Sequence, residues 1–273
     1  MNRDRLYRTE AIILKRNNFG EADRLLTLYT PYRGKYCVIA KGVRKPTSRK
    51  AGHLEILSHS KLLLARGRSL DIVTQAETIS AFPNLRADLT KTSRAYYVVE
   101  LIDRFTVEGI ENYPLFELLL QVLAWFNAES NIEVITRFYE LRLLGLVGYQ
   151  PQLFHCVRCD ETIRPGDNQF SISEGGVVCP RCRDRFPEIT ALPISVNALK
   201  VLRYLQLHTL EESYSLPLSP GIHRELERLM LKYITYHLER NLKSVEFIRL
   251  LRQPVTPGCV PSSSDISPAE EVL

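Results

Sequence analysis

Four cysteines in two Cys-x-x-Cys pairs constrain the fold of this chain more than any other feature of its sequence. The pairs are "CVRC" and "CPRC", and 19 residues separate them. Each pair can turn two thiolates toward one ion, and two such pairs close a tetrahedral all-cysteine site. The sequence therefore predicts one Zn²⁺ per chain, with a metal-free knuckle or a mononuclear iron site as alternatives. The four expected ligands are Cys156, Cys159, Cys179 and Cys182.

The residues between the two cysteine pairs predict a β-hairpin. Turn residues occur at Pro165-Gly166 and at Gly175-Gly176. This layout is typical of a zinc ribbon, and we place a zinc-ribbon-like insertion at residues 151–190. Four thiolate ligands leave no coordination position for a substrate water, so we expect the metal to be structural.

The first 80 residues predict a small barrel. Their short segments are rich in Ile, Leu, Val, Tyr and Thr and are separated by Gly, Pro and Asn turns. Five strands in so short a stretch favour an OB-fold barrel, although an SH3-like barrel fits the pattern almost as well. The expected strands are 10–16, 25–30, 35–41, 55–65 and 70–77.

From about residue 81 the apolar residues recur at helical spacing. The expected helices are 90–109, 112–128, 131–149, 195–208, 219–240 and 241–251. We therefore predict an α+β multidomain protein, with an OB-fold at 1–80 and an α-helical domain at 81–251 that carries the four-cysteine insertion. The tail, 252–273, is rich in Pro and Ser and has little apolar surface to bury, so we expect it to be disordered.

Charge is distributed unevenly along the chain. Residues 1–80 contain 16 Lys and Arg against 7 Asp and Glu, whereas residues 81–273 contain 20 against 24. A basic first third beside a mildly acidic remainder points to a polyanionic partner for the first third, with a solvated basic face as the alternative.

The basic charge is densest in "KGVRKPTSRK", residues 41–50, which the sequence places between the third and fourth strands. Such a loop suits the phosphates of a nucleic acid, bound without reading bases. Phe19, Tyr29, Tyr32 and Tyr36 are candidates for stacking on bases, and some of them must belong to the barrel core. The expected nucleic-acid contacts are Lys35, Lys41, Arg44, Lys45, Arg49, Lys50 and, for stacking, Tyr32.

Several function classes lack support in the sequence. It contains no phosphate-binding loop, dinucleotide-binding turn, zinc-protease helix or nucleophile elbow. We therefore expect a binding protein rather than an enzyme. No apolar run is long enough for a membrane span, and no signal-peptide core follows the first charges, so we expect a cytoplasmic protein.

Taken in their order along the chain, the sequence motifs given below resemble those of the RecO family of bacterial recombination mediators. The carrying segments are Glu21-Ala22-Asp23, Gly34, "AKGVRKPTSR", "RGRSLDIVTQAE" and "AYYVVELIDRF", and the resemblance continues through the cysteines to about residue 251. The resemblance implies an OB-fold that binds single- and double-stranded DNA. It also implies that the whole protein is associated with the nucleoid and anneals complementary strands. It further implies RecR as a partner in loading RecA, and binding to the acidic C-terminal tail of the single-strand DNA-binding protein.

Two other functions remain open from the residues alone. A zinc-ribbon protein that binds RNA or a transcription complex would also use a basic barrel, and a comparison of DNA and RNA affinity separates the two. A metal-dependent nuclease or transferase would yield product from labelled DNA and magnesium.

Overall fold

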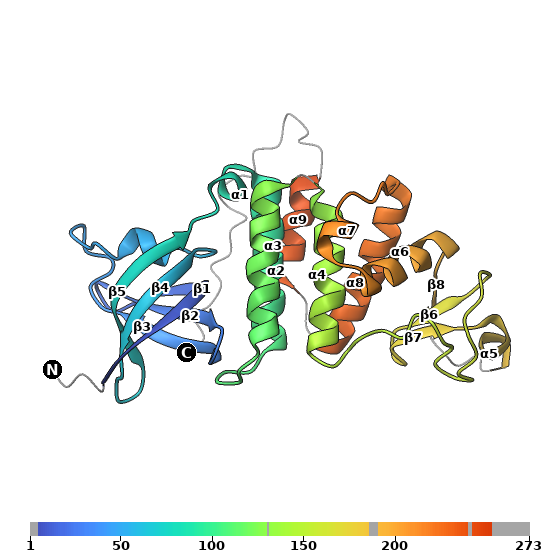
Figure 1. The fold of residues 1–273 in the computed structure, drawn as a ribbon, viewed down its shortest axis with the longest axis horizontal. Helices are drawn as coiled ribbons and strands as arrows, with labels where there is room; N and C mark the ends of the chain where they lie inside the picture. The colour runs from blue at the N-terminus through green and yellow to red at the C-terminus, as the bar shows by residue number, and fades with distance from the viewer. Residues whose placement is uncertain (1–4, 130, 186–190, 240–241, 253–273) are drawn as a thin grey trace, which may run out of the picture.

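The computed structural model describes residues 5–129, 131–185, 191–239 and 242–252. Figure 1 shows an elongated molecule with a barrel at one end, a group of helices in the middle and a small sheet at the other end. The predicted disordered tail lies, except for Arg252, outside the described residues. Within the described part of the chain, no helix is both long enough and apolar enough to cross a membrane.

The barrel is closed and has the strand order β1-β2-β3-β5-β4. Its strands are β1 (Leu6–Phe19), β2 (Asp23–Thr30), β3 (Gly34–Ala40), β4 (His59–Ala65) and β5 (Asp71–Ser80). Neighbouring strands run antiparallel except β3 and β5, which close the barrel in parallel. The predicted five-stranded OB-fold is thus confirmed.

The fourth strand is shorter than the sequence predicted. It begins at His59 and not at residue 55, and a 3₁₀ helix, η2 (Ala51–Leu54), precedes it. Leu57 adopts a positive φ of 70°, which no strand residue has. The apolar residues here are buried although they lie outside the strand. Leu54 packs into the barrel core, and Leu57 packs against the helices.

Strand alternation gives the barrel two apolar faces. Ala11, Ile13, Leu26 and Leu28 point into the barrel and form its core with residues of the other strands. The intervening residues Ile12, Leu14 and Tyr29 belong instead to the core of the helical region. The barrel is therefore packed against the helices through the outer face of β1 and β2.

The helical region follows the predicted pattern, with its ends set by polar caps. Its helices are α1 (Pro83–Ala87), α2 (Leu89–Phe105), α3 (Tyr113–Ala128), α4 (Ile132–Leu146), α6 (Val196–Leu207), α7 (Leu210–Ser213), α8 (Pro220–Leu238) and α9 (Lys243–Arg252). The side chains of Asp88, Asn112, Ser195 and Ser219 accept backbone N–H groups at the starts of α2, α3, α6 and α8.

Helix α2 ends four residues earlier than the sequence predicted. After Phe105 the chain leaves the helix and reaches the barrel, where the Gly109 N–H donates to the Lys35 carbonyl at 2.8 Å. Helix α4 likewise ends at Leu146 and not at residue 149, because Gly148 adopts a φ of 88°.

The four-cysteine unit contains a three-stranded sheet in the order β7-β6-β8. Its elements are β6 (Gln169–Ser171), β7 (Gly176–Val178), α5 (Pro180–Arg185) and β8 (Ala191–Pro193). The predicted hairpin is present between β6 and β7, whereas Pro165 and Gly166 form a bend ahead of it. Phe170 packs edge-on against Tyr233 of α8 at 5.3 Å, which joins the sheet to the helices.

Candidate metal centre and nucleic-acid interface

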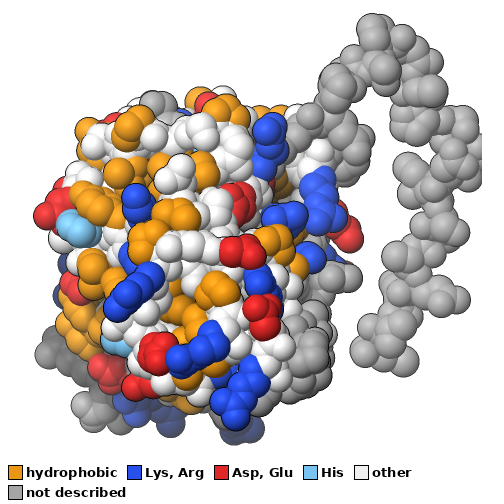
Figure 2. All heavy atoms as spheres, turned by 90° about the vertical axis from the view of Figure 1, so that its right-hand side faces the viewer, with side chains coloured by type: hydrophobic (Ala, Val, Ile, Leu, Met, Phe, Trp, Pro, Cys, Tyr) orange, Lys and Arg blue, Asp and Glu red, His pale blue; other side chains and the backbone are white. Residues whose placement is uncertain are grey.

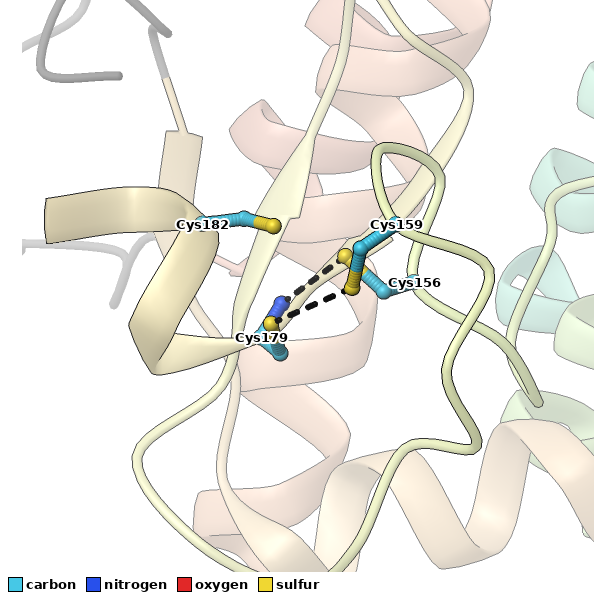
Figure 3. Close-up of side chains that lie close together, drawn as sticks. All are labelled: Cys156, Cys159, Cys179 and Cys182. Carbon is cyan, nitrogen blue, oxygen red and sulfur yellow. Dashed lines mark hydrogen bonds between the residues drawn. The ribbon is translucent and has the colours of Figure 1, made fainter. Parts of the chain in front are cut away.

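The four predicted ligands meet at one point. The Sγ atoms of Cys156, Cys159, Cys179 and Cys182 all lie within 4.8 Å of one another, and Figure 3 shows them converging. The Sγ atoms of Cys159 and Cys179 are 3.8 Å apart. A tetrahedral zinc site with Zn–S bonds of about 2.3 Å has S···S edges of roughly 3.8 Å, so the donor set and its spacing fit a metal of this kind.

The two cysteine pairs are positioned by different backbone structures. The first pair sits in a tight turn in which the Asp160 N–H donates to the Cys156 carbonyl at 2.9 Å and Asp160 has a φ of 57°. In the second pair, Cys179 precedes α5 and Cys182 projects from that helix (Figure 3). The Cys179 N–H also donates to Cys156 Sγ at 3.4 Å and so ties the two pairs together.

Hydrogen bonding prepares one of these thiols for ionisation. Burial raises the pKa of Cys156, but the N–H groups of Cys179, Cys159 and Arg158 outweigh it and bring the pKa to about 7. Burial and the neighbouring thiols raise the pKa of Cys182 to about 12. Four thiolates this close require a cation, and a bound metal would supply structural cross-linking.

Charges of both signs cover the surface around the cysteines. Figure 2 views this end of the molecule and shows Lys and Arg side chains interspersed with Asp and Glu and with apolar side chains. Arg158 pairs with Glu174, and the Arg181 guanidinium lies 2.7 Å from the Glu161 carboxylate. Among the residues that the structure describes, this surface therefore lacks the one-sided charge that a polyanion requires.

The basic loop at 41–50 is held firmly against the barrel. The Gly42 N–H donates to the Asp23 carboxylate at 2.7 Å, and the Arg44 N–H donates to the Ala22 carbonyl at 2.9 Å. Val43 is buried in the barrel core. These contacts explain the Glu21-Ala22-Asp23 motif, and successive turns shape the loop.

The loop presents most of its cations to solvent. Four side chains are exposed, and these are Lys41, Arg44, Lys45 and Arg49. Lys50 folds back, and its ammonium donates to the Val73 carbonyl at 2.8 Å and the Lys41 carbonyl at 3.2 Å. Burial lowers the pKa of Lys50 accordingly.

A hollow of about 610 Å³ adjoins the end of this loop. Its lining includes four basic side chains and one acid, and these are Arg8, Arg49, Lys50, Lys61 and Glu77. The sequence analysis missed Arg8 of β1 and Lys61 of β4. Both residues precede buried core positions by an odd number of residues, so strand alternation would have placed them on the outside of the barrel.

Two predicted contacts lie elsewhere. The Lys35 side chain is only 12% exposed, and its ammonium lies 2.5 Å from the Asp103 carbonyl oxygen and 3.5 Å from the Asp103 carboxylate. Tyr32 is exposed but stacks on Tyr113 of α3, with ring centroids 5.9 Å apart. The structure therefore brings Lys35 and Tyr32 to the junction between barrel and helices and not to the loop.

Of the other aromatic candidates, Phe19 lies beside the loop. Tyr36 is buried in the barrel core, and Tyr29 is buried in the core of the helical region. Phe19 is half exposed, and the carbonyl of the next residue, Gly20, accepts a hydrogen bond from the Arg44 guanidinium at 3.3 Å.

A second basic hollow, of about 270 Å³, lies between α2, α8 and α9. Its basic residues are Arg94, Arg137, Arg224, Arg228, Lys232 and Arg249, and its apolar lining includes Tyr97, Leu231, Val245 and Ile248. The sequence analysis missed it, although Arg224, Arg228 and Lys232 recur every four residues along α8.

Buried ion pairs support this second hollow from below. The guanidinium of Arg137 lies 2.8 Å from the fully buried Glu140 carboxylate, which also accepts the Tyr97 hydroxyl at 2.6 Å. Burial raises the pKa of Glu140, while the charge of Arg137 opposes the rise. Arg94 and Glu227 form a further pair at 3.3 Å.

Two family models match the chain in sequence. The model described as "Recombination protein O N terminal" covers residues 1–82, and that described as "Recombination protein O C terminal" covers residues 86–246.

Proteins named "DNA repair protein RecO" are similar over most of their length. The protein of Roseiflexus sp. is 45% identical over 267 residues, which are 96% of this chain and 93% of the relative. That of Dehalococcoides mccartyi is 39% identical, covering 88% of this chain and 93% of the relative. That of Desulforamulus reducens is 38% identical, covering 89% and 94%. Together with the barrel, the helices and the cysteine cluster, these matches show that the chain belongs to the RecO family of bacterial DNA repair proteins.

Proposed function

We propose that this protein binds single- and double-stranded DNA without sequence preference through the 41–50 loop and the hollow beside it, and anneals complementary strands. The observation that carries the proposal is the exposure of the loop's cations. Among the described residues, none of the side chains of Lys41, Arg44, Lys45 and Arg49 forms an ion pair with Asp or Glu. They are therefore available to phosphates, which would release counterions on binding.

The proposed contacts read no bases. Lys50 holds the end of the loop and adds charge to the hollow, where Arg8 and Lys61 extend the basic surface. Phe19 offers a face for stacking, which every base can use. Lys35 and Tyr32 act at the junction and not on DNA. Strand annealing needs no catalytic group, so we propose a role without chemical turnover.

The second hollow supports a protein partner with an acidic chain end. Four exposed basic side chains, Arg224, Arg228, Lys232 and Arg249, surround an apolar floor between α2, α8 and α9, whereas Arg94 and Arg137 are buried and paired with Glu227 and Glu140. This combination suits the acidic C-terminal tail of the single-strand DNA-binding protein, since carboxylates can pair with arginine while an apolar residue fills the floor. With RecR as a further partner, the protein would help RecA to load on coated single strands in the cytoplasm, at the nucleoid.

We propose zinc as the metal of the cysteine cluster. Four thiolates at tetrahedral spacing are the usual donors of structural Zn²⁺. Because the cluster lies at the opposite end of the molecule from the barrel, the metal would stabilise the helical region's far end and not contact the DNA (Figure 1).

A strand-annealing assay, run on bare strands and on strands coated by the single-strand DNA-binding protein, tests both sites. Arg44→Ala Lys45→Ala should weaken annealing on both substrates and reduce the salt slope of single-strand affinity by about 1.4, or roughly 0.7 for each lost phosphate contact. Arg228→Glu should slow annealing only on coated strands, because it places a carboxylate in the proposed tail site.

The matched control is Lys91→Ala Lys200→Ala, which removes two positive charges from the helices and should leave annealing and salt slope unchanged. Equal loss in the control and the loop variant would show that net charge alone matters. A loop variant with the wild-type slope would refute the proposed DNA site, as would a preference for RNA over DNA.

A further inference from the structure

The second hollow, between α2, α8 and α9, presents cations above an apolar floor. Its exposed cations are Arg224, Arg228 and Lys232 of α8 and Arg249 of α9. Among the residues that the structure describes, none of these four side chains forms an ion pair with Asp or Glu. The apolar floor includes Leu231, Val245 and Ile248. A site of this composition suits an acidic segment that also carries aliphatic side chains.

The same chain carries a segment of complementary composition. Residues 253–273 lie outside the described residues, and their sequence contains three acids and no Lys or Arg. All three acids fall within "DISPAEEVL", residues 265–273, beside aliphatic residues. The acids are Asp265, Glu270 and Glu271, and the aliphatic residues include Ile266, Val272 and Leu273. This segment therefore matches both the charge and the apolar floor of the second hollow.

The covalent connection to this segment starts beside the hollow. Helix α9 ends at Arg252, three residues after Arg249, which lines the hollow. Asp265 follows Arg252 by 13 residues, and a flexible linker of that length has a root-mean-square span of about 20 Å. The cations on α8, from Arg224 to Lys232, extend over only about 12 Å of helix. The length of the chain therefore allows the acids to reach the cations of the hollow.

We propose that residues 265–273 bind in the second hollow of their own chain and compete there with acidic tails of other proteins. Tethering gives the segment an effective concentration in the millimolar range, so even a weak contact keeps the hollow largely occupied. The inference rests on the proposed function in one respect, because the hollow that it regulates is the proposed site for a partner's acidic tail. A partner would then bind only by displacing the chain's own segment.

Fluorescence anisotropy of a labelled synthetic peptide with the sequence of residues 262–273 tests the inference. The protein is used as the full chain, either wild type or with the tail acids neutralised by Asp265→Asn Glu270→Gln Glu271→Gln. We expect this neutral-tail variant to bind the peptide about tenfold or more tightly than the wild type does, because the tethered segment no longer competes.

A matched variant controls for changes to the tail other than charge. Ser262→Ala Ser263→Ala Ser264→Ala also replaces three tail residues but keeps all three acids. It should bind the peptide within about twofold of the wild type. An affinity as high as that of the neutral-tail variant would show that the acids are not what occupies the hollow, and would overturn the inference.

Further changes in the neutral-tail variant locate the peptide. Arg228→Glu should weaken peptide binding at least about tenfold, because it removes a cation of the hollow and adds a carboxylate. Lys200→Glu makes the same change of charge at an exposed position of α6 and should keep the affinity within about twofold. Loss of binding in Arg44→Ala Lys45→Ala, with full binding in Arg228→Glu, would place the peptide on the barrel loop and overturn the inference.

Two other results would also overturn the inference. The first is equal affinity of the wild type and the neutral-tail variant for the peptide, or no binding to either protein. The second is a wild-type dimer in sedimentation that the neutral-tail variant lacks, because the segment would then bind a second copy of the chain. Equal oligomeric states of the two proteins support binding within one chain.

A second peptide separates this inference from the proposed function. It carries the C-terminal sequence of the single-strand DNA-binding protein from the same genome. If it binds the neutral-tail variant and the 262–273 peptide does not, the inference fails and the proposed function stands. If only the 262–273 peptide binds, the inference stands and the proposed partner of the hollow is removed.

Discussion

The barrel and the four-cysteine unit reach a stable structure by different means. The barrel closes five strands around inward-facing aliphatic side chains, and Leu26, Leu28, Val38 and Leu64 are almost completely buried. The four-cysteine unit has three strands of three residues each and brings four thiols within 4.8 Å. The buried side chains of this small sheet, Phe170, Val177 and Val178, pack into the helical core, and a metal held by the sulfurs would add a cross-link within the unit.

This difference separates two kinds of constraint on the sequence. In the barrel, many residues share the stabilisation, and each can be exchanged for another of similar volume. In the four-cysteine unit, exchange of any one cysteine would remove a ligand of the proposed metal site, whereas the other buried residues can vary as in the barrel. The barrel's surface is therefore free to carry a basic loop, whereas the surface beside the cysteines holds charges of both signs.

Removing two ligands should give the largest effect. We expect Cys179→Ser Cys182→Ser to lose about one zinc per chain and to unfold the segment around the cysteines, since structural zinc contributes about 10–16 kcal/mol in zinc-finger peptides. The barrel should keep its DNA affinity. Metal analysis, hydrogen exchange and a DNA titration measure the three properties, with Cys37→Ser in the barrel as the control that retains its metal. Stoichiometric metal in the double variant would contradict the assignment.

Truncating a barrel core residue should give an intermediate effect, in which stability falls and the metal content stays unchanged. We expect Leu28→Ala to lower the free energy of unfolding by about 2–5 kcal/mol, because it leaves a cavity among packed side chains. Its zinc content should equal that of the wild type. Leu207→Ala, at an exposed position, controls for the loss of leucine side chain, and thermal unfolding compares the two. Loss of zinc together with stability would show that the two regions are coupled more closely than their structures indicate.

Changing the turn of the first cysteine pair should give the smallest effect. Asp160 has a φ of 57°, where glycine is the residue without strain. We expect Asp160→Gly to raise the free energy of unfolding by about 0.5 kcal/mol, because relief of this strain exceeds the added entropy of the unfolded chain. Gly175→Ala is the converse change, at a φ of 72°, and should lower stability by about 1 kcal/mol. Equal shifts of the same sign in thermal unfolding would argue against a conformational cause.

Local sequence predicted the parts of the molecule that local physics determines. Alternating apolar residues and turn residues identified the five strands, and apolar residues at helical spacing located the main helices. The cysteine spacing predicted the cluster, because two short turns suffice to form it. Residues 55–58 were wrongly assigned to the fourth strand. Their apolar side chains are buried against the helices, and the sequence alone does not distinguish such residues from buried strand residues.

The remaining features depend on contacts between distant segments. No local pattern shows that β3 pairs in parallel with β5, or that the segment after Phe105 leaves α2 to bind the barrel. For the same reason Lys35 was grouped with the loop cations, although tertiary packing directs it to Asp103. The hollow beside the loop combines Arg8 and Lys61 from two strands, and only their antiparallel pairing brings them together.

The outer face of β1 and β2 determines whether the barrel can be produced as an isolated fragment. Ile12, Leu14 and Tyr29 are buried in the helical core although they belong to barrel strands. A fragment that ends after the last barrel strand would expose these side chains to water as an apolar surface, which would favour aggregation. We therefore expect the barrel to be unstable without the helices. Their contact also fixes the orientation of the basic loop relative to the rest of the molecule.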